Sequence, residues 1–171
     1  MRVLYVIAQE NFRDEEYLVP KDILEDAGAE VVTASPMGGV STGMLGAEVE
    51  ADLRIGDANP ADYDAVVVAG GGGSREYLWD DTDLRNILKG SYDDGKVVAG
   101  ICLSGAVLAK AGVLDGRKAT VFETPETVQA LDAGGAEYVK EDVVTDGKVI
   151  TASGPQAAEE YGRRIVEAIR R

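Results

Sequence analysis

Short runs of β-branched and apolar residues alternate along the chain with longer segments in which apolar residues recur at helical spacing. This alternation is typical of an α/β protein with a largely parallel sheet. The expected strands cover residues 2–8, 30–35, 64–69, 96–101 and 118–122. Glycines at 38, 39, 43 and 46 divide residues 36–55 into short pieces that suit a small hairpin.

Turn and capping residues mark the expected helices. These helices cover residues 14–27, 82–93 and 103–114, a short segment that starts at Thr124-Pro125, and a C-terminal segment that starts near Pro155. Pro20 should kink or delay the first turns of the first helix. We expect Thr82 to cap the second helix, and Ser153 and Gln156 to form a capping box for the last one.

Residues 143–151 alternate apolar and polar positions around Asp146-Gly147, which predicts a hairpin with a two-residue type I′ turn. No internal repeat, linker or change of composition divides the chain. We therefore expect a single domain over residues 1–171.

The excess of acidic over basic residues argues against nucleic acids and anionic membranes as partners. The chain has 31 acidic and 17 basic residues and a net charge of −14, so nucleic-acid backbones and anionic membranes should repel it. The acids are spread along the whole chain, which indicates an acidic folded surface, and a salt-rich cytoplasm is one setting that suits it. No apolar run approaches the ~20 residues of a membrane span, and the N-terminus lacks a cleavage site, so we expect a soluble, cytoplasmic protein.

The chain contains one cysteine and no histidine. This excludes an internal disulfide, a CxxC pair, the common structural zinc sites, and Ser-His-Asp or Cys-His catalysis within one chain. Asp80, Asp81 and Asp83 lack the spacing of a calcium loop and indicate surface charge at a helix cap. We expect no metal and no cofactor, and proton transfer must come from carboxylates, the thiol, tyrosine, lysine or water.

In an open parallel sheet, ligands bind beyond the carboxyl ends of the strands. The residues at these positions are 9–16 after the first strand, 70–73 after the middle strand and Cys102 after the next. Among the first set, we interpret Asp14 and Glu15 as a solvated helix start, whereas Glu16 is functional if it points into the crevice.

Cys102 stands where a buried strand turns into a helix, with Gly100 and Ser104 as small residues on either side. This pattern resembles the G-x-S-x-G nucleophile elbow with cysteine as the nucleophile. A helix N-terminus favours the thiolate, so the pattern predicts a reactive thiolate at neutral pH, and the alternative is a buried, inert cysteine. The glycines at 70–73 lack phosphate-loop spacing and predict either an oxyanion site or a flexible turn.

Five segments together resemble the ThiJ/PfpI superfamily over nearly the whole chain. They are residues 14–20, residues 63–71, Gly100-Ile101-Cys102, residues 111–120 and Gly154-Pro155. The resemblance implies a flavodoxin-like three-layer sandwich, with a mostly parallel sheet, helices on both faces and a nucleophile elbow. It also implies a homodimer or a higher homo-oligomer.

The resemblance further implies roles for individual residues. Cys102 would be the nucleophile, Glu16 would hydrogen-bond its sulfur, and the backbone of Gly71 and Leu103 would supply the oxyanion site. Gly70 and Phe122 would belong to the pocket.

Three positions depart from the family's pattern. Leu103 replaces the histidine of the protease branch, Phe122 replaces a frequent pocket His or Tyr, and Ala69 replaces the usual proline. These departures weigh against a Cys-His peptidase and against a histidine-assisted glyoxalase.

The preferred interpretation is an enzyme that acts on a small electrophile, a reactive carbonyl or its adduct. The Cys102 thiolate would form a hemithioacetal-type intermediate, with Glu16 as the proton partner. One alternative is an oxidation-sensing stress protein or chaperone that uses a Cys102 sulfinate without turnover. Another is a PfpI-type intracellular peptidase.

Overall fold

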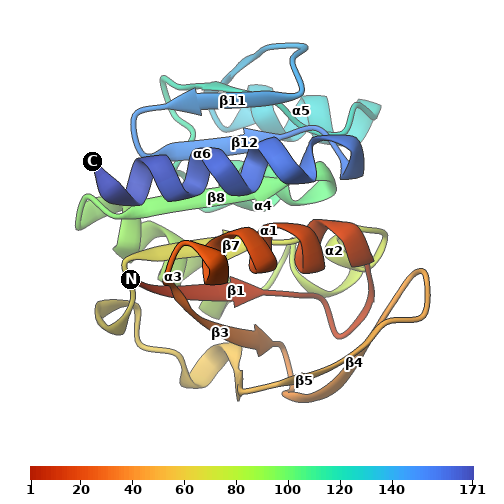
Figure 1. Cartoon of the computed structure of the whole chain (residues 1–171). Coiled ribbons are helices and arrows are strands. Elements are labelled where there is room, and N and C mark those ends of the chain that lie inside the picture. Colours follow the sequence, from red (N-terminus) through yellow and green to blue (C-terminus); the bar gives the residue numbers. More distant parts are fainter.

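The computed structural model describes residues 1–171, and its centre is a seven-stranded sheet (Figure 1). In spatial order the strands are β11 (Val143–Asp146), β12 (Val149–Ala152), β8 (Val97–Ile101), β7 (Ala65–Val68), β1 (Arg2–Val6), β3 (Glu30–Ser35) and β6 (Leu53–Arg54). All neighbours are parallel except β11 and β12. The α/β fold with a mostly parallel sheet is therefore confirmed.

The helices cover both faces of the sheet, as expected for a three-layer sandwich (Figure 1). They are α1 (Asp14–Asp26), α2 (Gly73–Tyr77), α3 (Thr82–Asp93), α4 (Gly105–Lys110), α5 (Pro125–Ala133) and α6 (Ala158–Arg170). Helices α1 and α6 lie together on one face, and α3 and α4 pack on the other. None of these helices combines the length and the apolar composition that a membrane crossing requires.

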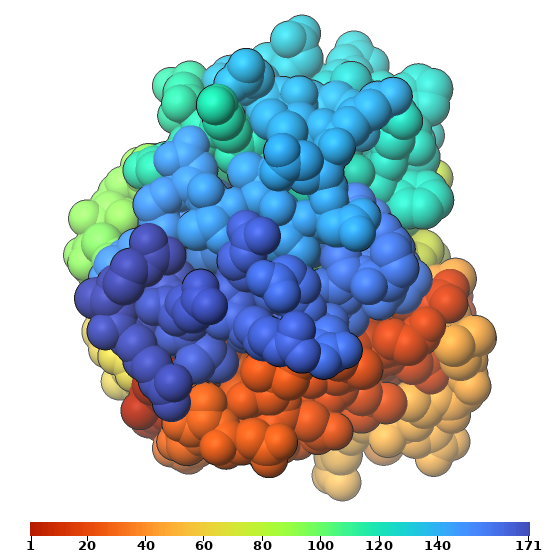
Figure 2. All heavy atoms as spheres, turned by 45° about the horizontal axis from the view of Figure 1, so that its top comes forward, coloured from red at the N-terminus to blue at the C-terminus, as the bar shows by residue number.

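The contact between α1 and α6 is close because Gly162 of α6 has no side chain. A Cβ at this position would lie 3.1 Å from the Cα of Pro20 and 3.1 Å from Cδ1 of Ile23. In Figure 2 the dark blue of α6 lies directly against the orange of α1. The first and last helices of the chain thus form one continuous layer.

The central strands place three loops side by side. Val6 at the end of β1 pairs with Val68 of β7, and Val68 pairs with Gly100 of β8. All four residues of β7 are buried, as is typical of a strand covered on both faces. The residues that follow β1, β7 and β8 therefore start at the same level and at the same edge of the sheet.

The hairpin expected within residues 36–55 is confirmed. It consists of β4 (Gly39–Gly43) and β5 (Glu48–Ala51), which pair antiparallel, and β4 also pairs with β2 (Glu10–Phe12). Asp14 is buried and its carboxylate accepts hydrogen bonds from the backbone N–H groups of Leu45 and Ala47, both at 2.9 Å. The interpretation of Asp14 as part of a solvated helix start is therefore wrong, because Asp14 fixes the hairpin tip.

Two elements are shorter than predicted. The strand expected over residues 118–122 covers only β9 (Lys118–Ala119), which pairs with β10 (Glu137–Tyr138) outside the central sheet. The helix expected over residues 103–114 is a 3₁₀ turn, Cys102–Ser104, followed by α4.

The structure also differs from the predicted caps of α3 and α6 and from the predicted turn of the last hairpin. Asp81 caps α3 in place of Thr82, because its Oδ1 accepts from the N–H of Leu84 at 2.9 Å.

The turn of the last hairpin also differs from the prediction. Asp146 pairs with Val149, so the two turn residues are Gly147 and Lys148. Only Gly147 has a positive φ, which excludes a type I′ turn. Before α6, the Gln156 side chain bonds the side chain of Ser153 rather than completing a capping box.

Helix α1 starts at Asp14 and continues through Pro20, without the predicted delay. Pro20 has no N–H to donate to the carbonyl of Glu16 four residues earlier. The hydroxyl of Tyr5 donates to that carbonyl instead, at 2.5 Å, from the neighbouring strand β1. A tertiary hydrogen bond thus replaces the missing helical one.

Candidate active site

Cys102 occupies a strained corner between β8 and α4. Its φ of +60° lies in the left-handed region, which is uncommon for a residue other than glycine. A Cβ at Gly100 would lie 2.7 Å from Cδ1 of Leu108 and 2.8 Å from the carbonyl oxygen of Ser104. The corner therefore needs the small residue before the cysteine, as in a nucleophile elbow.

Hydrogen bonds fix this corner to the turn after β7. The hydroxyl of Ser104 donates to the carbonyl of Ala69 at 2.6 Å and lies 2.7 Å from the hydroxyl of Ser74. The indole N–H of Trp79 donates to the carbonyl of Leu103 at 2.9 Å. The segments that carry Cys102 and the paired glycines are thus held as one unit.

The glycines at 70 and 71 leave room for other groups around the cysteine. A Cβ at Gly70 would lie 2.6 Å from Oε1 of Glu16 and 2.7 Å from the Cβ of Cys102. Gly71 has a φ of +100° and packs against the backbone of residues 11–13. The backbone N–H groups of Gly71 and Leu103 lie near the sulfur of Cys102 and lower the pKa of its thiol. The structure therefore brings together the four groups expected there: the thiol, the carboxyl group and the two N–H donors.

Glu16 is fully buried beneath the cysteine. Its Oε1 accepts a hydrogen bond from the N–H of Gly70 at 3.1 Å. Its Oε2 is buried without a hydrogen-bond partner, and the thiol of Cys102 lies close enough to the carboxyl group to lower the pKa of Glu16. Glu16 thus lies against the cysteine and does not line the crevice itself.

Burial shifts both acids of the pair in the same direction. It raises the pKa of Glu16 to about 7, against the hydrogen bonds from Cys102 and Gly70. It also raises the pKa of Cys102 to about 12, and the charge on Glu16 adds to this, whereas the two backbone N–H groups act in the opposite direction.

This direction is opposite to the thiolate predicted at neutral pH. A helix N-terminus stabilises the Cys102 thiolate less than predicted, because α4 has only six residues and starts at Gly105, beyond the cysteine. Burial of the thiol, and after it the charge on Glu16, raise the pKa of Cys102 more than the two backbone N–H groups lower it. Around neutral pH the Cys102 thiol therefore keeps its proton, and Glu16 is about half protonated.

A cavity of about 280 Å³ opens in front of the sulfur. It is lined by Arg13, Met44, Gly71, Gly72, Cys102, Leu103, Phe122 and Pro155. Phe122 lines it as predicted, and its N–H donates to the carbonyl of Cys102 at 3.2 Å. The prediction that Gly70 belongs to the pocket is wrong, because Gly70 packs against Glu16 and the Cβ of Cys102 and does not line the cavity.

Four further residues line the cavity without having been predicted individually: Arg13, Met44, Gly72 and Pro155. Pro155 lies shortly after the end of β12, and Arg13 lies within the loop after β1, so the rule on strand ends could have found both. Met44 lies at the tip of the β4–β5 hairpin, and no local signal points to it.

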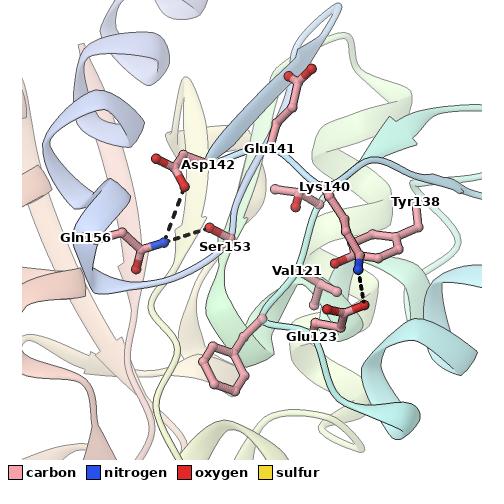
Figure 3. A pocket seen from close by; sticks show the side chains of 10 residues that line it. Val121, Glu123, Tyr138, Lys140, Glu141, Asp142, Ser153 and Gln156 are labelled. Atoms are coloured by element: carbon pink, nitrogen blue, oxygen red, sulfur yellow. Dashed lines mark hydrogen bonds and ion pairs between the residues drawn. The ribbon is translucent and has the colours of Figure 1, made fainter.

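A second cavity of about 350 Å³ shares Phe122 with the first. Figure 3 shows its polar lining: Lys140 pairs with Glu123 at 3.1 Å, and the amide of Gln156 donates to Ser153 at 2.9 Å. The two cavities therefore adjoin at one aromatic side chain.

Nowhere do three or more His, Cys, Asp or Glu side chains form a cluster that could hold a metal ion.

Comparisons with known proteins agree with this geometry. The model of the DJ-1/PfpI family matches residues 1–168. An uncharacterised protein of Methanocaldococcus jannaschii is 46% identical over 168 residues, which cover 98% of this chain and 82% of that protein. A deglycase of Pyrococcus horikoshii is 33% identical over 170 residues, which cover 99% of this chain and 100% of that protein. The crystal structure of a ThiJ/PfpI domain protein from Brachyspira murdochii superimposes with a TM-score of 0.92 at 34% identity, covering 99% of this chain and 96% of the other.

Proposed function

Because the chain belongs to the DJ-1/PfpI family, we propose that it is a cysteine-dependent enzyme that acts on small reactive carbonyls or their adducts. Relatives named deglycase align with almost the whole chain and support a deglycase-like role. The observation that carries the proposal is the arrangement of the Cys102 thiol, the buried Glu16 carboxyl group and two backbone N–H donors at one cavity.

The proposed first step is the addition of the thiol to a carbonyl carbon. The sulfur–carbon bond forms as the proton of the thiol passes to Glu16, and the π electrons of the carbonyl move to its oxygen. The N–H groups of Gly71 and Leu103 stabilise the negative charge on that oxygen. Glu16 then returns the proton to the oxygen, which gives a neutral hemithioacetal.

The raised pKa of Glu16 suits this exchange. A group that gives and takes protons works best when its pKa is close to the pH of the reaction, and that of Glu16 is about 7. With no histidine in the chain, Glu16 is the group we assign to proton transfer at the sulfur. The high pKa of the cysteine means that the thiolate forms only as Glu16 takes the proton.

The two adjoining cavities support an adduct as substrate. A free small carbonyl fills only part of the 280 Å³ in front of the sulfur. The second cavity, beyond Phe122, offers polar groups to the amine- or thiol-bearing part of an adduct. We therefore prefer adducts of reactive carbonyls to the free carbonyls.

An oxidation sensor is the second candidate. Cys102 is the only cysteine, and the two N–H donors that would hold an oxyanion would equally hold a sulfinate. The peptidase alternative has less support, because Leu103 follows the cysteine and the chain has no histidine to pair with it. The homodimer stays a prediction, which the mass in solution by light scattering would test.

The test is a turnover measurement with the hemithioacetal of methylglyoxal and N-acetylcysteine. We expect many moles of product per mole of enzyme, and none from Cys102→Ser. Product limited to one equivalent or less, together with one equivalent of sulfinate after mild peroxide treatment, would contradict the enzyme and select the sensor.

A further inference from the structure

Arg13 is the only charged side chain among the eight residues that line the cavity in front of Cys102. Its backbone N–H donates to the carbonyl of Gly70 at 2.9 Å, so its Cα is held next to the glycine turn. Gly71 permits this approach, because a Cβ at that position would overlap the backbone nitrogen of Arg13. The backbone thus fixes the origin of this side chain beside Gly70 and Gly71, on the cavity that Cys102 also lines.

Glu15 orients the guanidinium of Arg13. Nε of Arg13 donates to Oε1 of Glu15, and Nη2 donates to Oε2, both at 3.0 Å. A guanidinium has five N–H donors, so this pair uses one edge and leaves three donors, including both on Nη1. No other hydrogen bond or ion pair uses them, and the Arg13 side chain is 31% exposed. The expected solvated position of Glu15 thus holds only in part, because its carboxylate is committed to Arg13.

The free edge of Arg13 has the geometry that binds a carboxylate through two parallel N–H···O bonds. The positive charge also reaches the reacting pair, because it lowers the pKa of Glu16. In a chain with a net charge of −14, a cation in the lining of an otherwise uncharged cavity provides local attraction for an anion. A neutral carbonyl compound would make no use of it.

We propose that Arg13 is a specificity-determining residue that selects electrophiles carrying a carboxylate close to the carbon that Cys102 attacks. This inference deepens the proposed function and rests on its nucleophile, Cys102. It names the substrate class as an anionic carbonyl compound or adduct. Glu15 serves as the positioning residue that turns the free edge of the guanidinium away from itself.

The test uses iodoacetate and iodoacetamide, two reagents that differ in one carboxylate. With either reagent the sulfur of Cys102 forms a bond to carbon and iodide leaves, and a single cysteine per chain makes the alkylation rate unambiguous. The rate ratio of iodoacetate to iodoacetamide is measured for the whole protein and normalised to the same ratio for free N-acetylcysteine. We expect a ratio above one for the wild type and a fall of roughly tenfold to a hundredfold in Arg13→Gln, since charge-assisted hydrogen bonds have about this effect.

Arg163→Gln is the matched control. It removes the same charge from the exposed side of α6, where Arg163 pairs with Glu159 and Glu160, and it should leave the ratio unchanged. Equal ratios in the wild type and Arg13→Gln would overturn the role of Arg13 and leave the nucleophile in place. If neither reagent modified Cys102, the proposed function would fail, and the inference with it.

Discussion

The hydroxyl of Tyr5 donates a hydrogen bond of 2.5 Å to the backbone carbonyl of Glu16. Both residues are fully buried, and Pro20 leaves that carbonyl without its helical donor. Tyr5 lies on β1, a strand inside the seven-stranded sheet, so it ties the first turn of α1 to the core of the sheet. The side chain of Glu16 leaves α1 at this point and reaches Cys102. Tyr5 is therefore a positioning residue for the carboxyl group at the sulfur.

Replacing Tyr5 by Phe should lower both stability and turnover. The substitution leaves a buried carbonyl unpaired, which destabilises a protein by about 1–3 kcal/mol. It also loosens the backbone that carries Glu16, so kcat should fall while KM stays close to the wild-type value. Urea unfolding and steady-state kinetics of Tyr5→Phe measure the two effects.

Tyr17→Phe is the control for this prediction. The hydroxyl of Tyr17 is buried in the same aromatic cluster and lies 2.6 Å from Oγ1 of Thr33, without a contact to the Glu16 carbonyl. The Tyr17→Phe substitution should lower the free energy of unfolding by a similar amount and leave kcat unchanged. An equal loss of kcat in both variants would show that Tyr5 acts only through stability.

Protonation of Glu16 should make stability depend on pH. Folding raises the pKa of Glu16 from its ordinary 4.5 to about 7, so the folded state keeps a proton that the unfolded state has released. Stability from this group is fully present below about pH 4.5 and is lost as the pH rises through about 7. The raised pKa corresponds to about 3 kcal/mol.

The measurement compares the wild type with Glu16→Gln by urea unfolding at several pH values between about 4.5 and 8. The free energy of unfolding should fall over this range by up to about 3 kcal/mol more in the wild type than in the variant. Subtraction of the two curves removes the contribution of the other carboxylates. Parallel curves would mean that Glu16 is ionised at its ordinary pKa despite its burial.

A methyl group at position 70 should disrupt the site. In Gly70→Ala the Cβ would meet the carbonyl oxygen of Ile101 at 2.5 Å, besides Glu16 and Cys102. These atoms belong to the core and cannot move aside freely, so a loss of about 1–3 kcal/mol and of most turnover is expected. In Gly72→Ala the Cβ meets nothing within 4 Å and φ is not positive, so stability should hardly change. Equal melting temperatures of the two variants would contradict the packing described for Gly70.

Salt should stabilise the protein. A surface with 31 acidic and 17 basic residues repels itself, and at about 0.1 M salt screening acts over about 10 Å. The melting temperature should therefore rise from dilute buffer to about 1 M KCl. A curve that stays flat or falls would exclude a fold adapted to high salt.

The central strands and the elbow could be predicted from the sequence, because their signals are local. The apolar run that forms β7 and the pattern Gly100-x-Cys102-x-Ser104 need no distant partner. Phe122 and Glu16 were assigned from a family resemblance, and the structure places both at the cysteine.

The features that were missed depend on residues far apart in the chain. The burial of Asp14 depends on the N–H groups of a hairpin tip about thirty residues later, and the continuity of α1 through Pro20 depends on the Tyr5 hydroxyl. The raised pKa of Cys102 depends on burial and on the charge of Glu16. None of these is visible in the spacing of neighbouring residues.

The central claim is that Glu16 moves the proton for Cys102, and the kcat of Glu16→Gln near pH 7 tests it most directly. The variant keeps the shape of the side chain and should be at least as stable as the wild type at this pH, so a loss of rate reports on chemistry. General acid–base catalysis contributes about 10²–10⁴-fold, and we expect a loss of that size with the methylglyoxal–N-acetylcysteine adduct, against none for Glu25→Gln at the exposed end of α1. A Glu16→Gln variant that turned over at the wild-type rate, while Cys102→Ser did not, would contradict the role of Glu16.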